Sequence, residues 1–256
     1  MENIVFYFSG TGNSLKVAKT LAKELGNCEI VSMGKSEKYN VIKQYDTIGF
    51  VHPVYYWGLP KKVVEFIKNV NFNNMSSYYY AIATYGGIIG NGNRQLNKLL
   101  NERNIILNYG GKIRMVANYI INYDIFNNIS KCLKRADKKL SSIISDVRNK
   151  KNNKIKKPNK KIEQIYQNAV QSISLVQDYN VNDNCIGCGI CKEVCPVGNI
   201  EIINKKPVFN NKCECCVACI QYCPRQAINY KDKTQKRKRY THPEISYTEL
   251  SKYNNK

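Results

Sequence analysis

A repeated cysteine pattern constrains this chain of 256 residues more than any other feature. The first copy reads Cys185-Ile-Gly-Cys188-Gly-Ile-Cys191-Lys-Glu-Val-Cys195-Pro196, and the second reads Cys213-Glu-Cys-Cys216-Val-Ala-Cys219-Ile-Gln-Tyr-Cys223-Pro224. Every matching cysteine is displaced by 28 residues, and nine of the eleven cysteines fall between Cys185 and Cys223. The sequence therefore predicts a small domain built from two similar halves.

The spacing within each copy, C-x2-C-x2-C-x3-C-P, is typical of cysteines that hold a 4Fe–4S cubane. Three closely spaced cysteines wrap one cluster, and the fourth ligates the cluster of the other half. The first cluster should use Cys185, Cys188, Cys191 and Cys223, and the second should use Cys213, Cys216, Cys219 and Cys195. Zinc would need four ligands in paired C-x2-C knuckles, and disulfides would need an oxidising compartment. Two clusters are the favoured interpretation.

Three cysteines lie outside this ligand set. Cys215 stands between two of the predicted ligands, and we interpret it as a free thiol. Cys28 and Cys132 are expected to pack inside the protein.

The first 120 residues alternate short apolar runs with amphipathic helical patterns, which is typical of an α/β fold with a parallel sheet. The predicted strands are Ile4–Phe8, Glu29–Ser32, Thr47–Val51, Tyr78–Ala83 and Lys112–Ala117. The predicted helices are Ser14–Leu25, Lys61–Val70, Arg94–Arg103 and Ser130–Arg148. Residues 1–148 should therefore form one domain.

The remainder of the chain divides into three parts. Residues 149–180 hold a basic linker followed by an amphipathic helix, Ile162–Gln177, which is expected to dock two domains together. Residues 181–232 form the smaller α+β cysteine domain. Residues 233–256 are expected to be a loosely held basic tail.

A glycine-containing loop follows the first predicted strand and leads into the first helix. It reads Ser9-Gly-Thr11-Gly12-Asn13-Ser14. Unpaired backbone N–H groups at a helix start, flanked by hydroxyl groups, bind a phosphate without a basic side chain. The loop lacks the Lys-Ser/Thr ending of a nucleotide-triphosphate loop, so it is predicted to bind a single phosphate group.

Two further loops follow the third and fourth strands, at the carboxyl edge where open α/β sheets bind ligands. The residues in them that we expect to bind the cofactor are Pro53, Tyr55, Tyr56, Trp57 and Gly58, and Thr84, Tyr85, Gly86 and Gly87. The aromatic rings can flank a flat ring system, while the glycines let backbone amides approach it.

These three loops resemble those of flavodoxins, and the resemblance covers residues 1–148. It implies FMN as the cofactor and a sheet of strand order 2-1-3-4-5. It also implies that Ser9, Thr11, Gly12, Asn13 and Ser14 hold the phosphate, while Tyr56, Trp57 and Tyr85 contact the isoalloxazine ring. Residues 184–229 resemble bacterial ferredoxins with two 4Fe–4S clusters. The whole chain is similar to flavodoxin–ferredoxin fusion proteins of anaerobic bacteria and archaea.

The chain carries a net charge of +21, which raises the question of an anionic partner. Its lysines are spread along the chain, and a nucleic-acid-binding protein with structural clusters would need base-stacking aromatic residues in a basic groove. No such groove is recognisable, so nucleic acid is not an expected partner. Without a long apolar run or a leader, we expect a cytoplasmic protein with no membrane span.

The sequence shows no nicotinamide-binding domain and no catalytic triad or carboxylate pair beside the flavin loops, so no catalytic residues are predicted. Electron transfer between FMN and two 4Fe–4S clusters is the expected function, with redox proteins as partners. The alternative is a reductase of the same flavin and iron–sulfur type that acts on a small-molecule acceptor. Whether the chain is an enzyme stays open, and a homodimer would also bring flavin and clusters together.

Overall fold

A computed structural model describes residues 2–34, 39–41, 43–72, 76–125, 128–171 and 178–254. Its main sheet has five parallel strands in the order β2-β1-β4-β6-β7. They are β1 (Asn3–Tyr7), β2 (Cys28–Ser32), β4 (Thr47–Pro53), β6 (Tyr78–Tyr85) and β7 (Tyr109–Arg114). Counted without the short strands β3 (Asn40–Val41) and β5 (Asn71–Phe72), this is the expected order 2-1-3-4-5.

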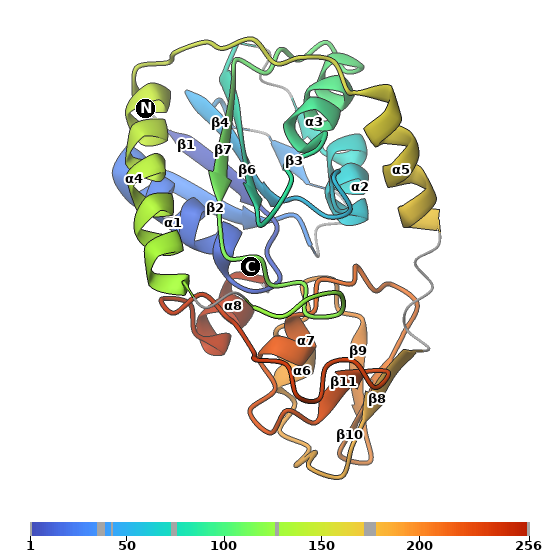
Figure 1. Cartoon of the computed structure of the whole chain (residues 1–256). Helices are drawn as coiled ribbons and strands as arrows, with labels where there is room; N and C mark the ends of the chain where they lie inside the picture. The colour runs from blue at the N-terminus through green and yellow to red at the C-terminus, as the bar shows by residue number, and fades with distance from the viewer. Residues whose placement is uncertain are drawn as a thin grey trace.

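Helices cover both faces of this sheet, as Figure 1 shows. On one face lie α1 (Asn13–Leu25) and α4 (Ile129–Arg148), and on the other lie α2 (Lys61–Asn69) and α3 (Gly92–Asn101). Alternate residues of β1 point to opposite faces, so that Val5 and Tyr7 join the first core while Ile4 and Phe6 join the second. Two buried layers therefore hold the strand ends in place.

One predicted strand is misplaced by three residues. The sequence indicated Lys112–Ala117, whereas β7 ends at Arg114. The backbone N–H of Met115 still bonds to the Tyr85 oxygen at 2.8 Å, and the chain then leaves the sheet. The apolar run therefore continues past the strand because its last residues are buried in a loop at the strand ends, where burial and not pairing requires apolar side chains.

The segment after α4 returns across the sheet domain and ends in α5 (Lys160–Gln171). Tyr166 of α5 is buried, and its hydroxyl donates to the Leu59 oxygen at 2.8 Å. Glu163 accepts hydrogen bonds from Asn91 and Gln95 of the α3 region. The predicted docking helix is thus attached to the first domain; its expected end, residues 172–177, lies outside the described residues.

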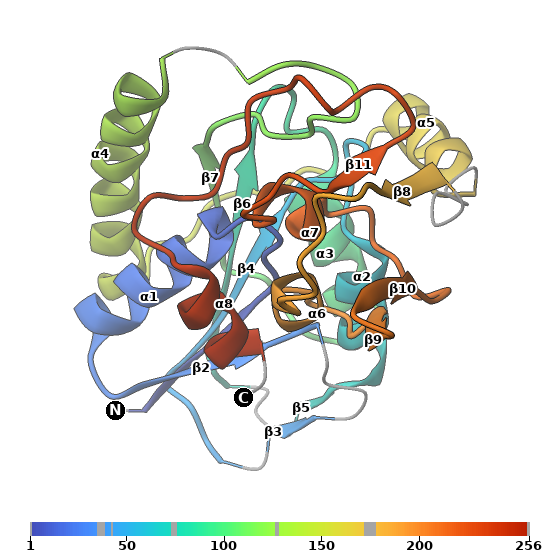
Figure 2. The same ribbon diagram turned by 90° about the horizontal axis from the view of Figure 1, so that it is seen from below.

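The small domain lies beyond the carboxyl ends of the sheet strands (Figures 1 and 2). It contains two antiparallel pairs, β8 (Tyr179–Val181) with β11 (Ile228–Tyr230) and β9 (Ile200–Ile203) with β10 (Lys206–Phe209). Its two short helices, α6 (Ile190–Glu193) and α7 (Ala218–Gln221), are also 28 residues apart. The sequence repeat is therefore a structural repeat.

The repeat extends to the backbone conformation. Gly187 and Gly189 have φ angles of 70° and 77°, and the matching residues Cys215 and Val217 have 51° and 57°. Both halves therefore use the same left-handed turns, although only the first half has glycine there. Cys215 stands at a turn position and is buried.

The prediction of a loosely held C-terminal tail is wrong. Residues 233–254 cross back to the first domain and end in α8 (Tyr247–Asn254), which packs beside β2. Ile245 and Leu250 are buried in the core shared with α1 and α4. The Tyr7 hydroxyl of the first strand donates to the side chain of Asn254 at 3.0 Å. The basic residues occupy the first part of this segment, and its apolar residues anchor the rest.

Within these described ranges, no helix has the length and apolar character required to cross a membrane.

Replacing Leu250 with alanine tests the anchored end. Leu250 is fully buried, so Leu250→Ala should lower the free energy of unfolding by about 2–5 kcal/mol. Urea unfolding of the anaerobic protein measures this. Ile106→Ala is the control, because Ile106 is 74% exposed and its loss should change stability by less than about 0.5 kcal/mol. Equal effects of the two substitutions would contradict the packing described.

Candidate functional site

A cavity of about 440 Å³ opens at the carboxyl ends of β1, β4 and β6. All three predicted loops line it, and of the predicted cofactor-binding residues only Gly12 and Gly58 do not. The lining residues from the prediction are Ser9, Thr11, Asn13, Ser14, Pro53, Tyr55, Tyr56, Trp57, Thr84, Tyr85, Gly86 and Gly87. Gly12 instead lies against Ile245 and His242, and Gly58 against Tyr166. The fold thus gathers the three loops at one place.

The phosphate loop, residues Ser9–Ser14, is held by hydrogen bonds to its acceptor atoms. The Ser9 Oγ accepts the backbone N–H of Gly12 at 3.2 Å, and the Thr11 Oγ1 accepts the Asn118 amide at 2.5 Å. Each hydroxyl then keeps its own proton for another acceptor. Both side chains are buried, and both line the cavity. The arrangement fits an anion that accepts hydrogen bonds from hydroxyl groups and from the start of α1.

A tight turn, residues 55–58 (the aromatic turn), presents two aromatic residues at the cavity. Tyr55 and Gly58 exchange backbone hydrogen bonds of 3.0 and 2.8 Å, and the residues between them, Tyr56 and Trp57, have φ angles of 49° and 65°. Such angles at two bulky residues are strained, and strained backbone of this kind gathers at ligand sites. The Tyr56 ring meets the ring of Tyr119 edge to face, with centroids 5.8 Å apart, and their hydroxyls are hydrogen-bonded.

The structure adds lining residues that the sequence did not indicate. They are mainly Met115–Tyr119, together with Asn122 and Tyr123, in the loop that follows β7. Ala169 of α5 and the segment Cys215–Val217 of the small domain complete the wall. The apolar residues Met115 and Val116 are visible in the sequence, but their pattern predicts a continuation of the strand and not a cavity-lining loop. Nothing in the sequence indicated that the small domain would close the cavity.

Cys185, Cys188, Cys191 and Cys223 line one small pocket of the cysteine domain. Three belong to the first copy of the motif and the fourth to the second copy, as the exchanged-ligand pattern requires. Cys188 is the exposed member, whereas Cys191 is buried.

The other four predicted ligands also interact with one another. The charges of Cys195 and Cys213 both act to raise the pKa of Cys216, after the larger effect of burial. Burial is also the main cause that raises the pKa of Cys219, followed by the charges of Cys216, Cys213 and Cys195. A buried thiolate is unfavourable unless a metal holds it. Among the described residues no group is arranged to hold a single metal ion.

Hydrogen-bond donors around these sulfur atoms fit iron–sulfur clusters. The N–H of Asn199 lies 3.2 Å from the Cys195 sulfur, and the N–H of Ala227 lies 3.2 Å from the Cys223 sulfur. In the described part of the chain, two buried guanidinium nitrogens of Arg239 have no protein partner. Burial lowers the pKa of Arg239 while the charges of Cys223 and Cys219 raise it, which places its charge beside one predicted ligand of each cluster. Sulfur acceptors of bound clusters would satisfy such donors.

Two glycines of the first domain allow the small domain to approach closely. A Cβ atom at Gly10 would lie 2.8 Å from the Cys216 oxygen and 2.9 Å from the Cys216 Cβ. A Cβ atom at Gly34 would overlap the carbonyl oxygen of Pro196. One loop of the cysteine domain therefore rests directly on the phosphate loop, and the residue after Cys195 rests on the loop after β2.

A carboxylate reinforces this interface. Glu214 lies between Cys213 and Cys215, and its Oε1 accepts the backbone N–H of Lys62 at 2.7 Å. This N–H belongs to the first turn of α2, where an acidic group is favourable. Burial raises the pKa of Glu214 to about 7.

Neither histidine lines the cavity. His52 is fully buried behind the aromatic turn, where Pro53 O and Asn93 Oδ1 lie 3.1 Å from its two ring nitrogens. Burial lowers its pKa. These contacts give His52 a structural role. His242 is buried beside the phosphate loop.

Two family models match the chain. A flavodoxin domain matches residues 4–117, and a 4Fe–4S binding domain matches residues 180–201. Among curated proteins, the polyferredoxin protein MvhB of Methanothermus fervidus is 33% identical over 52 residues, which are 20% of this chain and 13% of that protein. The iron–sulfur subunit of the nitrate-inducible formate dehydrogenase of Escherichia coli is 38% identical over 63 residues, 21% of each chain. The chain thus spans less than a quarter of these two relatives.

Solved structures also match part of the chain. A putative flavoprotein from Bacteroides uniformis is 21% identical, with a TM-score of 0.38, covering 44% of this chain and 90% of that one. A flavodoxin from the domain Archaea is 13% identical, with a TM-score of 0.34, covering 58% of this chain and 99% of that one.

Gly10→Ala should lower the amount of flavin that the purified protein retains. The added methyl group meets Cys216, so the two loops must separate and the wall formed by Cys215–Val217 must move away from the cavity. Flavin absorbance per chain after desalting measures the effect. Gly26→Ala is the control, since the added methyl group strains a residue with a φ of 68° yet meets no atom within 4 Å. Parental flavin content in Gly10→Ala would contradict this account.

Proposed function

We propose that this chain, which joins an N-terminal flavodoxin domain to a C-terminal 4Fe–4S domain, is an electron carrier that holds FMN and two 4Fe–4S clusters in contact. The observation that carries the proposal is the shared cavity wall, where Cys216 stands beside the phosphate loop and the aromatic turn. When bound, FMN exchanges one or two electrons and each cluster exchanges one, so together they link pair chemistry to single-electron steps.

The phosphate loop would hold the FMN phosphate. The hydroxyl groups of Ser9 and Thr11 would donate hydrogen bonds to it. Their oxygens already accept hydrogen bonds from Gly12 and Asn118, so the hydroxyl hydrogens can point to the phosphate. Asn13 and Ser14 begin α1, where the helix start favours an anion. Tyr56 and Trp57 would lie beside the isoalloxazine ring, together with Tyr85 from the loop after β6. FMN, with its terminal phosphate, suits this loop.

Cys185, Cys188, Cys191 and Cys223 would hold the first cluster, and Cys213, Cys216, Cys219 and Cys195 the second. The shared pocket of the first group supports the exchange of the fourth ligand. The second group would lie next to the flavin, because Cys216 lines its cavity. The first group would lie farther out, where Cys188 and the neighbouring Ile186 are exposed. A redox partner protein would exchange electrons at this outer end.

The cavity rim favours a second candidate function, a reductase acting on a small-molecule acceptor. Trp57, Ile88 and Tyr123 line the cavity and are exposed, with 38%, 64% and 37% of their surfaces accessible. These apolar side chains border the open side, where a flat acceptor could reach the flavin. Turnover with small quinones or nitro compounds, in the absence of a protein partner, would favour this function over the carrier.

Cysteine replacement tests the cluster assignment. The anaerobic protein should contain about eight iron and eight sulfide per chain with one FMN, as two 4Fe–4S clusters require. Cys223→Ala should damage the cluster held mainly by the first copy of the motif, which lowers iron content and changes the electron paramagnetic resonance signal of that cluster. Cys132→Ala, at a cysteine outside the ligand set, should keep the parental iron content. Stoichiometric zinc without sulfide, or FAD in place of FMN, would refute the proposal.

A further inference from the structure

The C-terminal segment lies directly against the phosphate loop. The backbone N–H of His242 donates to the backbone oxygen of Thr11 at 2.9 Å. The Tyr240 hydroxyl donates to the Asn13 Oδ1 at 2.8 Å. On the same side, a Cβ at Gly12 would lie 2.9 Å from the Ile245 Cβ and 3.1 Å from the His242 Cβ. The segment therefore contacts three consecutive residues of the loop and leaves no space behind Gly12.

The Tyr240 contact decides what Asn13 can offer to a ligand. An asparagine side chain has one accepting oxygen and one donating nitrogen. Tyr240 occupies the oxygen, so the amide NH2 of Asn13 stays available in a side chain that also lines the cavity. Tyr240 is itself buried, so water does not compete for this hydrogen bond. Asn13 is thus preset as a donor, which is the role a phosphate needs.

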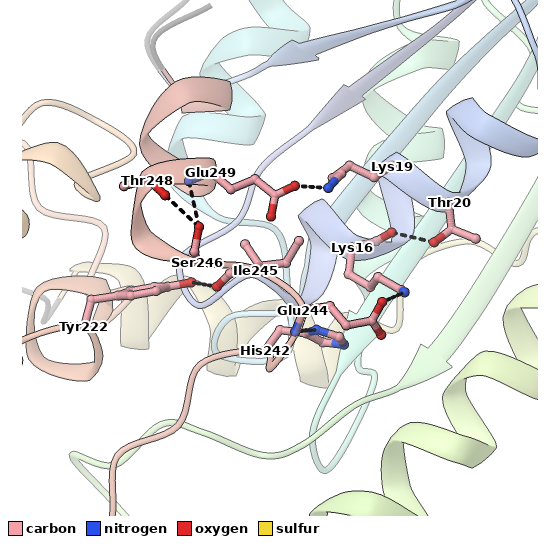
Figure 3. Close-up of polar contacts among 10 residues, drawn as sticks. All are labelled: Lys16, Lys19, Thr20, Tyr222, His242, Glu244, Ile245, Ser246, Thr248 and Glu249. Atoms are coloured by element: carbon pink, nitrogen blue, oxygen red, sulfur yellow. Dashed lines mark hydrogen bonds and ion pairs between the residues drawn. The ribbon is translucent and has the colours of Figure 1, made fainter.

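Several contacts fix the segment in this position (Figure 3). Glu244 and Glu249 form ion pairs with Lys16 and Lys19 of α1. Ser246 directly precedes α8, and its Oγ accepts the N–H of Glu249 at 3.1 Å, which is one half of a helix capping box. The Tyr222 hydroxyl donates to the Ile245 oxygen at 3.3 Å. The segment is therefore bound to both domains.

A single side chain links this segment to the second group of cysteines. Gln221 ends α7, the helix that contains Cys219. Its Oε1 accepts the backbone N–H of Tyr240 at 2.8 Å, and its side-chain amide donates to the backbone oxygen of Asn118 at 2.7 Å. Asn118 in turn donates to Thr11. The position of the phosphate loop thus depends on contacts from the cysteine domain and from the C-terminal segment together.

We propose that residues 240–254 form part of the flavin-binding site and that Tyr240 is a positioning residue that holds Asn13 as a donor to the phosphate. The inference rests on the proposed FMN site but assigns a role to a part of the chain that lies outside the flavodoxin-domain match. Because Tyr240 acts on the phosphate loop, its replacement should weaken the binding only of ligands that carry the phosphate.

Comparing FMN with riboflavin, which lacks the phosphate, tests this role. The measurement is the dissociation constant of each flavin for the full-length, cluster-containing protein after its own flavin has been removed. Tyr240→Phe should bind FMN roughly tenfold more weakly, the scale of one buried hydrogen bond, and riboflavin with unchanged affinity. Tyr247→Phe is the matched control, because Tyr247 begins α8 and is exposed, and both affinities should equal those of the parent.

A double-mutant cycle separates positioning from general damage. In an Asn13→Ala background, Tyr240→Phe should cause no further loss of FMN affinity, since the side chain that it positions is gone. Unchanged FMN binding in Tyr240→Phe, or equal weakening of FMN and riboflavin, would overturn the inference while leaving the proposed function intact. A parent protein that binds no FMN would instead refute the proposed function, and the inference with it.

Discussion

The contact between the cysteine domain and the phosphate loop is the constraint on which the rest of the structure depends. Gly10 lets the backbone of Cys216 reach the loop, and Gly34 does the same for Pro196. Any side chain at either position would force the domains apart. Glu214 strengthens the contact by accepting a hydrogen bond at the start of α2. The cavity at the sheet edge is complete only because this contact exists, since Cys215–Val217 form part of its wall.

Two other segments serve the same arrangement from opposite sides. Helix α5 is attached to the aromatic turn through Tyr166 and Leu59, and it brings Ala169 to the cavity. The C-terminal segment returns to α1 and the phosphate loop, where Tyr240 and His242 bond to it. The chain therefore crosses between the domains more than once. Such multiple crossings favour one fixed arrangement over a mobile cluster domain on a tether.

Much of this could be predicted from local signals. Four of the five strands follow from periodicity and the phosphate loop from one motif, because these depend on residues close in sequence. The strand order follows from the resemblance to flavodoxins. Long-range packing was not accessible in this way: the cavity walls made by Cys215–Val217 and by the Met115–Tyr119 loop depend on how the domains meet. The anchored end could have been predicted, since Ser246 and Glu249 form a capping-box pattern before the apolar Leu250. The basic run Lys236–Arg239, earlier in the same segment, instead favoured the interpretation as a loosely held tail.

The central claim is that one chain places its flavin next to its own second cluster. Rapid mixing of the cluster-reduced protein at two or more protein concentrations, with flavin absorbance as the readout, tests it most directly. The account predicts a rate of flavin reduction that does not change with protein concentration, because Cys216 and the phosphate loop share one cavity wall. A rate proportional to protein concentration would contradict it, since flavin and clusters would then meet only between different copies of the chain.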